Sequence, residues 1–120
     1  MTTSIRLNMA KTRKREIEQN IQTLEKCKRN MNPIQEQTDT ANSNFAEASF
    51  FERTEWNGEN ANNFKEERVE VRSSGRSLAR EMETITQTVT KEVSSLQTEL
   101  TAVINEIRML EQQLQDEMMN

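Results

Sequence analysis

The chain contains no histidine, no tyrosine, one proline, one tryptophan, one cysteine and two glycines among its 120 residues. Without histidine, and with a single cysteine, the usual nucleophile–base pairs and the Cys- or His-based metal sites are excluded. One cysteine also cannot form an internal disulfide. So few turn-forming residues exclude a β-sandwich or β-barrel, which needs frequent turns. We therefore expect a protein that is not an enzyme and that holds no cofactor and no metal.

The chain also lacks long apolar runs. None approaches the ~18 residues that a membrane-spanning helix requires. The first residues read MTTSIRLNMAKTRKRE and lack the continuous apolar segment of a secretory signal peptide. We expect a protein without a membrane span that is made in the cytoplasm, and whose export would use a route independent of that signal.

Charge is distributed unevenly along the chain. Residues 1–30 carry eight basic and three acidic side chains, whereas the other 90 residues carry eight and seventeen. The basic run Lys11, Arg13, Lys14 and Arg15 is a candidate nucleic-acid or membrane contact, but it has no interleaved aromatics on which bases could stack. An antiparallel hairpin explains the asymmetry better, because the basic segment would then lie beside the acidic C-terminal third. That third carries Glu99, Glu106, Glu111, Asp116 and Glu117.

Apolar residues in the second half recur at alternating steps of three and four. This heptad pattern lasts about six heptads without a proline, and it predicts one helix over about residues 60–118. The stripe consists of Val71, Gly75, Leu78, Met82, Ile85, Val89, Val93, Leu96, Leu100, Val103, Ile107, Leu110, Leu114 and Met118.

A weaker stripe in the first half predicts a helix over about residues 4–52, with N-cap candidates at residues 2–4. The proline, Pro33, follows Asn32, and this pair either starts a new helix or kinks a continuous one. We expect a bend or short break near residues 30–33. The cysteine, Cys27, falls beside the stripe and is predicted to be half-buried. The stripe consists of Ile17, Ile21, Leu24, Met31, Thr38, Ala41, Phe45 and Ala48.

A strong turn signal separates the two predicted helices. Asn57 and Gly58 both tolerate positive φ angles, so the dipeptide favours a chain reversal. The sequence therefore predicts a turn over residues 54–60 and a single domain, residues 1–120, built as an antiparallel two-helix hairpin.

The heptad pattern of apolar residues on the second helix extends further than the sparser pattern of the first helix can cover. Most helical stability comes from packing such a stripe rather than from propensity. We therefore expect a second hairpin, from another copy or another protein, to close an elongated helical bundle. The predicted partner interface consists of Val71, Leu78, Met82, Ile85, Val89, Val93, Leu96, Leu100, Val103, Ile107, Leu110 and Leu114.

The turn segment WNGENANNFKEER carries a spaced set of residues, Trp56, Gly58, Ala61, Phe64 and Arg68. In a two-helix chain of this size, the set resembles the WXG100 superfamily, and most closely its YwqH-like branch. The resemblance implies a small targeting factor or chaperone. Such a protein would bind the helical N-terminal domain of an LXG-type toxin and present it to the type VII secretion machinery of Gram-positive bacteria.

The same resemblance assigns the hairpin tip, Trp56, Gly58, Ala61 and Phe64, to a secretion motif. Superfamily members often carry a Tyr-x-x-x-Asp/Glu signal after the second helix, but this chain has no tyrosine. We expect the toxin, or a second small helical partner, to supply that signal. The alternative is a structural coiled-coil protein that associates with itself and has no role in secretion.

Overall fold

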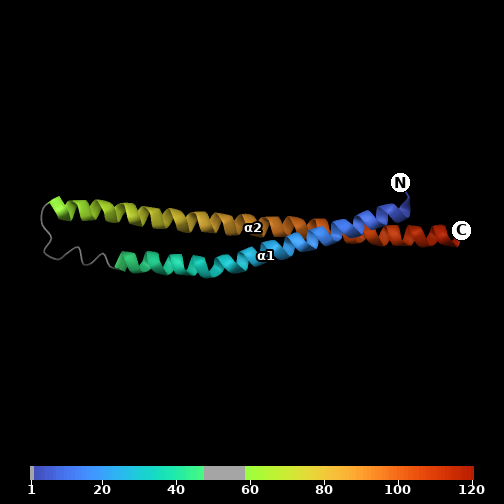
Figure 1. Ribbon diagram of the computed structural model, residues 1–120, viewed down its shortest axis with the longest axis horizontal. Coiled ribbons are helices and arrows are strands. Elements are labelled where there is room, and N and C mark those ends of the chain that lie inside the picture. The colour runs from blue at the N-terminus through green and yellow to red at the C-terminus, as the bar shows by residue number, and fades with distance from the viewer. Residues whose placement is uncertain (1, 48–58) are drawn as a thin grey trace. The chain divides into compact units, whose positions relative to one another are not determined.

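The computed structural model describes residues 2–47 and 59–120, without the side chains of residues 47 and 59–64. Within these ranges the chain forms two helices and no strand: α1, Thr3–Glu47, and α2, Glu59–Met119 (Figure 1). The all-α hairpin prediction is thereby confirmed. The predicted end of the first helix (residues 48–52) and most of the predicted turn lie outside the described residues.

A threonine caps the start of α1. The Oγ1 atom of Thr2 accepts a hydrogen bond from the backbone N–H of Ile5 at 3.2 Å, and the Thr2 carbonyl accepts one from Arg6 at 3.0 Å. The first N–H groups of a helix have no partner within the helix, so this cap satisfies one of them. The predicted N-cap thus lies where the helix begins.

The structure decides two sequence predictions about α1. The helix is continuous through Pro33, so this proline does not start a new helix. A proline removes one backbone donor and leaves the carbonyl four residues earlier, that of Arg29, without its helical partner. Both residues are exposed, which places solvent beside that carbonyl. The prediction of a half-buried Cys27 is wrong, since this residue is exposed.

The chain divides into two compact units, each made from one stretch of α1 and one stretch of α2. Unit 1 comprises Met1–Lys28 and Thr88–Asn120, and unit 2 comprises Arg29–Gln87. In both units the two stretches pair in antiparallel fashion. In unit 1 Thr3 contacts Glu117 and Arg13 contacts Glu106. In unit 2 Thr38 contacts Met82 and Asn42 contacts Gly75. Rising residue numbers on α1 thus meet falling numbers on α2 in each unit.

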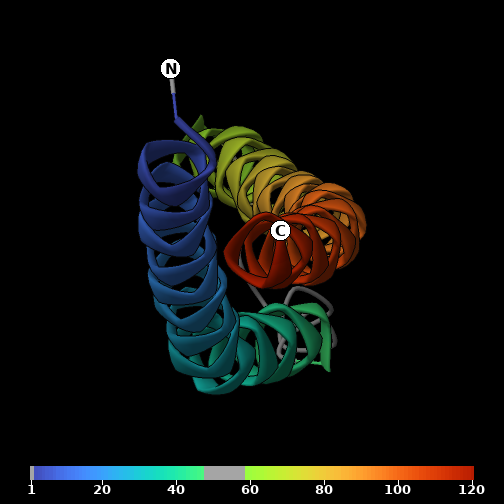
Figure 2. The ribbon, with the colours of Figure 1, turned by 90° about the vertical axis from the view of Figure 1, so that its right-hand side faces the viewer.

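In unit 1 the blue part of α1 lies beside the orange-to-red part of α2 (Figures 1 and 2), and buried side chains from both parts form an apolar core. Val103 is 1% exposed and is the most deeply buried side chain described. Around this core, α2 contributes a further row of partly buried residues. The core consists of Leu7, Ala10, Ile17, Ile21, Val103, Ile107 and Leu110, and the partly buried row of Val93, Leu96, Leu100 and Leu114.

Polar contacts accompany this core at the paired ends of the helices. The hydroxyl of Thr3 donates a hydrogen bond to Oε1 of Glu117 at 2.7 Å, and Arg13 lies 3.6 Å from Glu106. The basic N-terminal segment therefore lies beside the acidic C-terminal third, as the charge distribution predicted. Both side chains of the ion pair are largely exposed, so it contributes at most about 1 kcal/mol.

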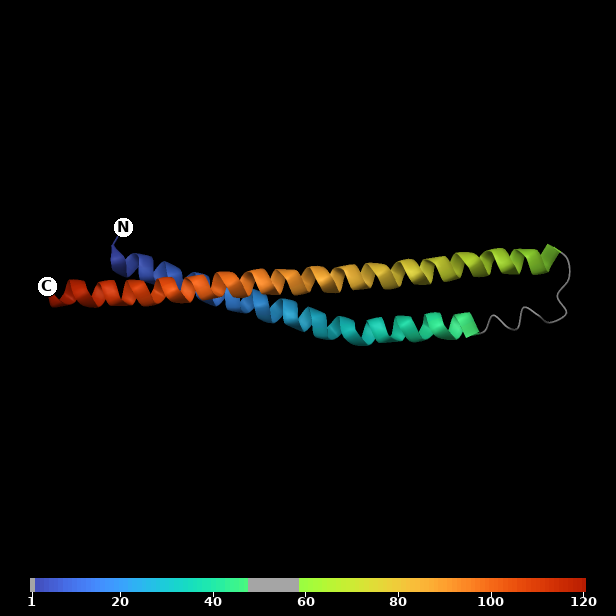
Figure 3. The same ribbon diagram turned by 180° about the vertical axis from the view of Figure 1, so that it is seen from behind.

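In unit 2 the teal part of α1 runs beside the yellow-green part of α2 (Figure 3), and polar contacts join the two. The amide of Asn42 donates to the Gly75 carbonyl at 3.0 Å. Arg68 donates to the Phe45 carbonyl at 3.4 Å, and its guanidinium lies 5.4 Å from the centre of the Phe45 ring. Met82 is the one buried hydrophobic residue in the described part of unit 2.

We predict that truncating the core of unit 1 destabilises the protein. Leu110→Ala should lower the free energy of unfolding by about 2–4 kcal/mol, because Leu110 is 3% exposed and its loss leaves a cavity. The neighbouring substitution Met109→Ala is the control, since Met109 is 72% exposed and should change stability by less than about 0.5 kcal/mol. Urea unfolding followed by circular dichroism measures both. Equal effects of the two substitutions would contradict the assignment of the core.

We further predict that Gly75 and Asn42 are energetically coupled. A Cβ atom at position 75 would overlap Oδ1 of Asn42, whose amide bonds the Gly75 carbonyl. Gly75→Ala gains about 1 kcal/mol of helix propensity, but it displaces a hydrogen bond worth about 0.5–1.5 kcal/mol. Gly75→Ala should therefore raise the free energy of unfolding of the Asn42→Ala variant. In the original chain it should leave that free energy unchanged or lower it. A double-mutant cycle by urea unfolding measures the difference; identical effects in both backgrounds would exclude this coupling.

Candidate partner-binding surface

The structure describes only part of the predicted secretion motif. Trp56 and Gly58 lie outside the described residues. Ala61 and Phe64 belong to the first turns of α2, where the helix is described but the side chains are not. The packing of Trp56 against Ala61 and Phe64 therefore remains a prediction.

The predicted partner interface divides into three groups according to exposure. The chain itself buries Met82, Val89, Val103, Ile107 and Leu110. A second group, Val93, Leu96, Leu100 and Leu114, is partly buried against the core of unit 1. The third group is exposed at about half of its surface and consists of Val71 (53%), Leu78 (49%) and Ile85 (48%).

The exposed group forms a stripe on unit 2, which we call the apolar stripe: Val71, Leu78 and Ile85. Residues seven apart on a helix lie on the same face, so the three side chains line up along α2. On α1, Ile34 is also half exposed. Thr38 contacts Met82. Ile34 lies about one turn before Thr38 on α1 and Ile85 about one turn after Met82 on α2, so the two lie at the same level of the antiparallel pair. Unit 2 thus presents apolar surface from both helices.

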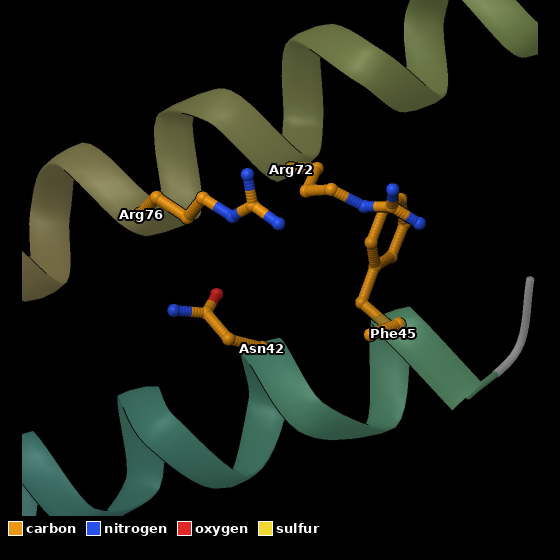
Figure 4. Close-up of a pocket in the computed structure, with 5 residues that line it drawn as sticks. Asn42, Phe45, Arg72 and Arg76 are labelled. Carbon is orange, nitrogen blue, oxygen red and sulfur yellow. The ribbon is translucent and has the colours of Figure 1, made fainter.

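A pocket of about 200 Å³ also lies in unit 2, between the two helices (Figure 4). Asn42, Phe45 and Ala46 line it from α1, and Arg72 and Arg76 line it from α2. In the close-up, Arg72 extends to the Phe45 ring, and the guanidinium of Arg76 points toward the space above Asn42. The two arginines are four residues apart, which places them on neighbouring turns of one helix side.

The pocket carries positive charge without a matching carboxylate in the described ranges. Arg68 is engaged with the carbonyl and ring of Phe45. In contrast, Arg72 and Arg76 form no ion pair or hydrogen bond with any residue that the structure describes. The Nε atom of Arg72 is buried and has no hydrogen-bond partner there. Desolvating a donor of a charged group without a replacement partner costs free energy, so this atom calls for an explanation.

Our reading of the sequence missed this pocket, although part of the signal was present. Arginines at positions 68, 72, 76 and 80 follow a strict spacing of four, which places successive guanidinium groups along one side of a helix. The contribution of Asn42 and Phe45 could not be found in this way, because it depends on how α1 and α2 are aligned in unit 2.

Groups of three or more histidine, cysteine, aspartate or glutamate residues that could hold a metal ion do not occur in the described ranges. Neither α1 nor α2, over the residues described, has a stretch apolar enough to cross a membrane.

These observations define the class: a helical-hairpin protein that exposes an apolar stripe and an arginine-lined pocket on one of its two compact units. The model of the YwqH-like family matches residues 3–118, and the chain belongs to this family. The match spans both helices, so it covers the apolar stripe and the pocket together. A search of curated proteins and a search of solved structures each gave no match.

Proposed function

We propose that this protein is a targeting factor or chaperone for an LXG-type toxin. In this role it binds the helical N-terminal domain of the toxin and helps to present it to the type VII secretion machinery. The toxin domain, or a second small helical partner, packs against unit 2 and closes a helical bundle there.

The contrast between the two units carries this proposal. Unit 1 buries eight of the nine buried hydrophobic residues that the structure describes, whereas unit 2 buries Met82 and leaves Ile34 and the apolar stripe half exposed. Two helices that bury so little apolar surface gain little stability from packing. An amphipathic partner helix laid over the apolar stripe supplies the missing burial, with anchors at heptad spacing.

Family membership supports the same role. The chain belongs to the YwqH-like family, and the resemblance drawn from its sequence implies that such proteins are small partners of LXG toxins. Trp56 and Gly58 have the spacing of the Trp-x-Gly motif on which that resemblance rests. In the proposed complex Trp56 forms one half of an export signal, and the partner supplies the Tyr-x-x-x-Asp/Glu half that this chain lacks.

Self-association is the second candidate function, because the apolar stripe would also suit another copy of the chain. Gel filtration with light scattering of the protein alone separates the two. A structural coiled-coil protein forms a homodimer that the stripe holds together, whereas a dedicated toxin partner forms its stable complex only when the toxin domain is present.

We predict that the triple substitution Val71→Ser, Leu78→Ser and Ile85→Ser abolishes co-elution with the helical N-terminal domain of an LXG-type toxin from the same organism. The three side chains are half exposed, so the helicity of the free chain should change little. Ile5→Ser with Met9→Ser is the matched control, because these residues are equally exposed (50% and 53%) but belong to unit 1. Co-elution of the triple variant at the original level would exclude the apolar stripe as the binding surface.

We also predict that Trp56→Ala separates assembly from export. The apolar stripe lies away from position 56 in the sequence, so the toxin complex should still form and co-elute. Export of the toxin into the culture medium should fall by about tenfold or more, as measured by immunoblotting of cells and medium. Unchanged export with an intact complex would contradict a signalling role for this residue.

A further inference from the structure

We propose that the arginine pocket of unit 2 recognises a carboxylate on the partner helix, that is, the side chain of an aspartate or glutamate. The identity of the partner in this inference rests on the proposed function. The preference for a carboxylate is argued only from the residues and geometry of the pocket. The residues that carry it are Asn42, Phe45, Arg72 and Arg76.

Charge is the first argument. Two guanidinium groups line one pocket and are not neutralised by any carboxylate that the structure describes. Arg76 is exposed and Arg72 is half-buried, so their mutual repulsion is weak, and an anion between them would replace it with attraction to both. Arginine is also the side chain whose planar donor fork matches a carboxylate in two parallel hydrogen bonds.

Burial is the second argument. The Nε atom of Arg72 has lost its contact with water, and no described residue replaces it. A half-buried arginine in this condition is poorly compensated in the free chain, and an anion in the pocket would offset the cost electrostatically. The pocket is large enough for this purpose, since its volume is about 200 Å³ and one water molecule needs only about 10–15 Å³ of such space.

The lining indicates a protein side chain rather than a free inorganic anion. The Phe45 ring and the Ala46 methyl group form apolar walls beside the arginines, and Arg72 extends to the ring (Figure 4). Apolar walls suit the methylene groups of a glutamate or aspartate side chain. The pocket also lies on the same unit as the apolar stripe, so a partner that covers unit 2 can reach both.

The main experiment measures, by calorimetry, the Kd for the helical N-terminal domain of an LXG-type toxin from the same organism. Arg72→Gln and Arg76→Gln should each weaken binding by about 10–100-fold, because each removes charge-assisted hydrogen bonds. Arg72→Lys should weaken binding by less, since it keeps the charge and loses the donor fork. The control is Arg80→Gln, which makes the same charge change on an exposed residue of α2 outside the pocket. Pocket variants that bind within twofold of this control would overturn the inference.

Two further readouts separate recognition from a structural role. Arg72→Met should leave the urea midpoint of the free chain unchanged or raise it, because it removes a poorly compensated charge while keeping an apolar stem. A structural arginine would give a lowered midpoint instead, which counts against the inference. Arg72→Glu should be rescued by changing one acidic residue of the toxin domain to lysine, and failure of every such single change to restore binding also counts against it.

A titration of the free chain makes the result independent of the toxin. Sodium acetate, added against sodium chloride at constant ionic strength, should shift the Nε–H NMR signals of Arg72 and Arg76 saturably and leave that of Arg80 unmoved. If the toxin domain does not bind the unaltered protein, the proposed function fails, and this titration alone decides the carboxylate site. Shifts with inorganic phosphate but not with acetate, or no shifts with either, would overturn it.

Discussion

The architecture of the described ranges depends on the antiparallel contact between α1 and α2, over which those ranges place no third layer. Each helix can therefore bury only the face that meets the other helix. The stability of each unit then depends on which side chains lie on that face. In unit 1 the face is apolar on both sides, with Leu7, Ala10 and Val103 among its most buried members. Most of the buried apolar residues that the structure describes therefore lie in unit 1, although Ile5, Met9 and Met109 of the same unit are exposed.

Unit 2 uses the same geometry with different chemistry. Its contacts are a side-chain amide against a glycine carbonyl, a hydroxyl against a thioether, and Arg68 against the last turns of α1. The described α1 has no basic residue in its own last turn. Arg68 therefore brings from α2 the positive charge that the C-terminal end of a helix favours. Directional contacts of this kind set the alignment of the two helices, but they contribute little net stability in water, which leaves unit 2 as the part that gains most from a partner.

The sequence was sufficient for the features that depend on local patterns. Steps of three and four predicted α2 almost to its observed ends, and the charge asymmetry predicted the pairing that places Arg13 beside Glu106. It was not sufficient for features that depend on alignment between the helices. Whether Leu78 or Met82 is covered depends on which residue of α1 stands opposite, and periodicity along one helix does not contain that information. The arginine pocket escaped prediction for the same reason.

The composition of unit 1 from the two ends of the chain has a consequence for how the molecule folds. The hydrogen bond between Thr3 and Glu117 joins residues 114 positions apart, whereas Asn42 and Gly75 are separated by 33. Closing a longer loop costs more entropy, so the contacts of unit 2 form at a lower entropic cost and bring the ends of the chain closer together. The difference is about 1 kcal/mol, and it favours a folding route in which unit 2 closes before unit 1. Along that route, a partner that stabilises the closed unit 2 would also bring the two ends of the chain together.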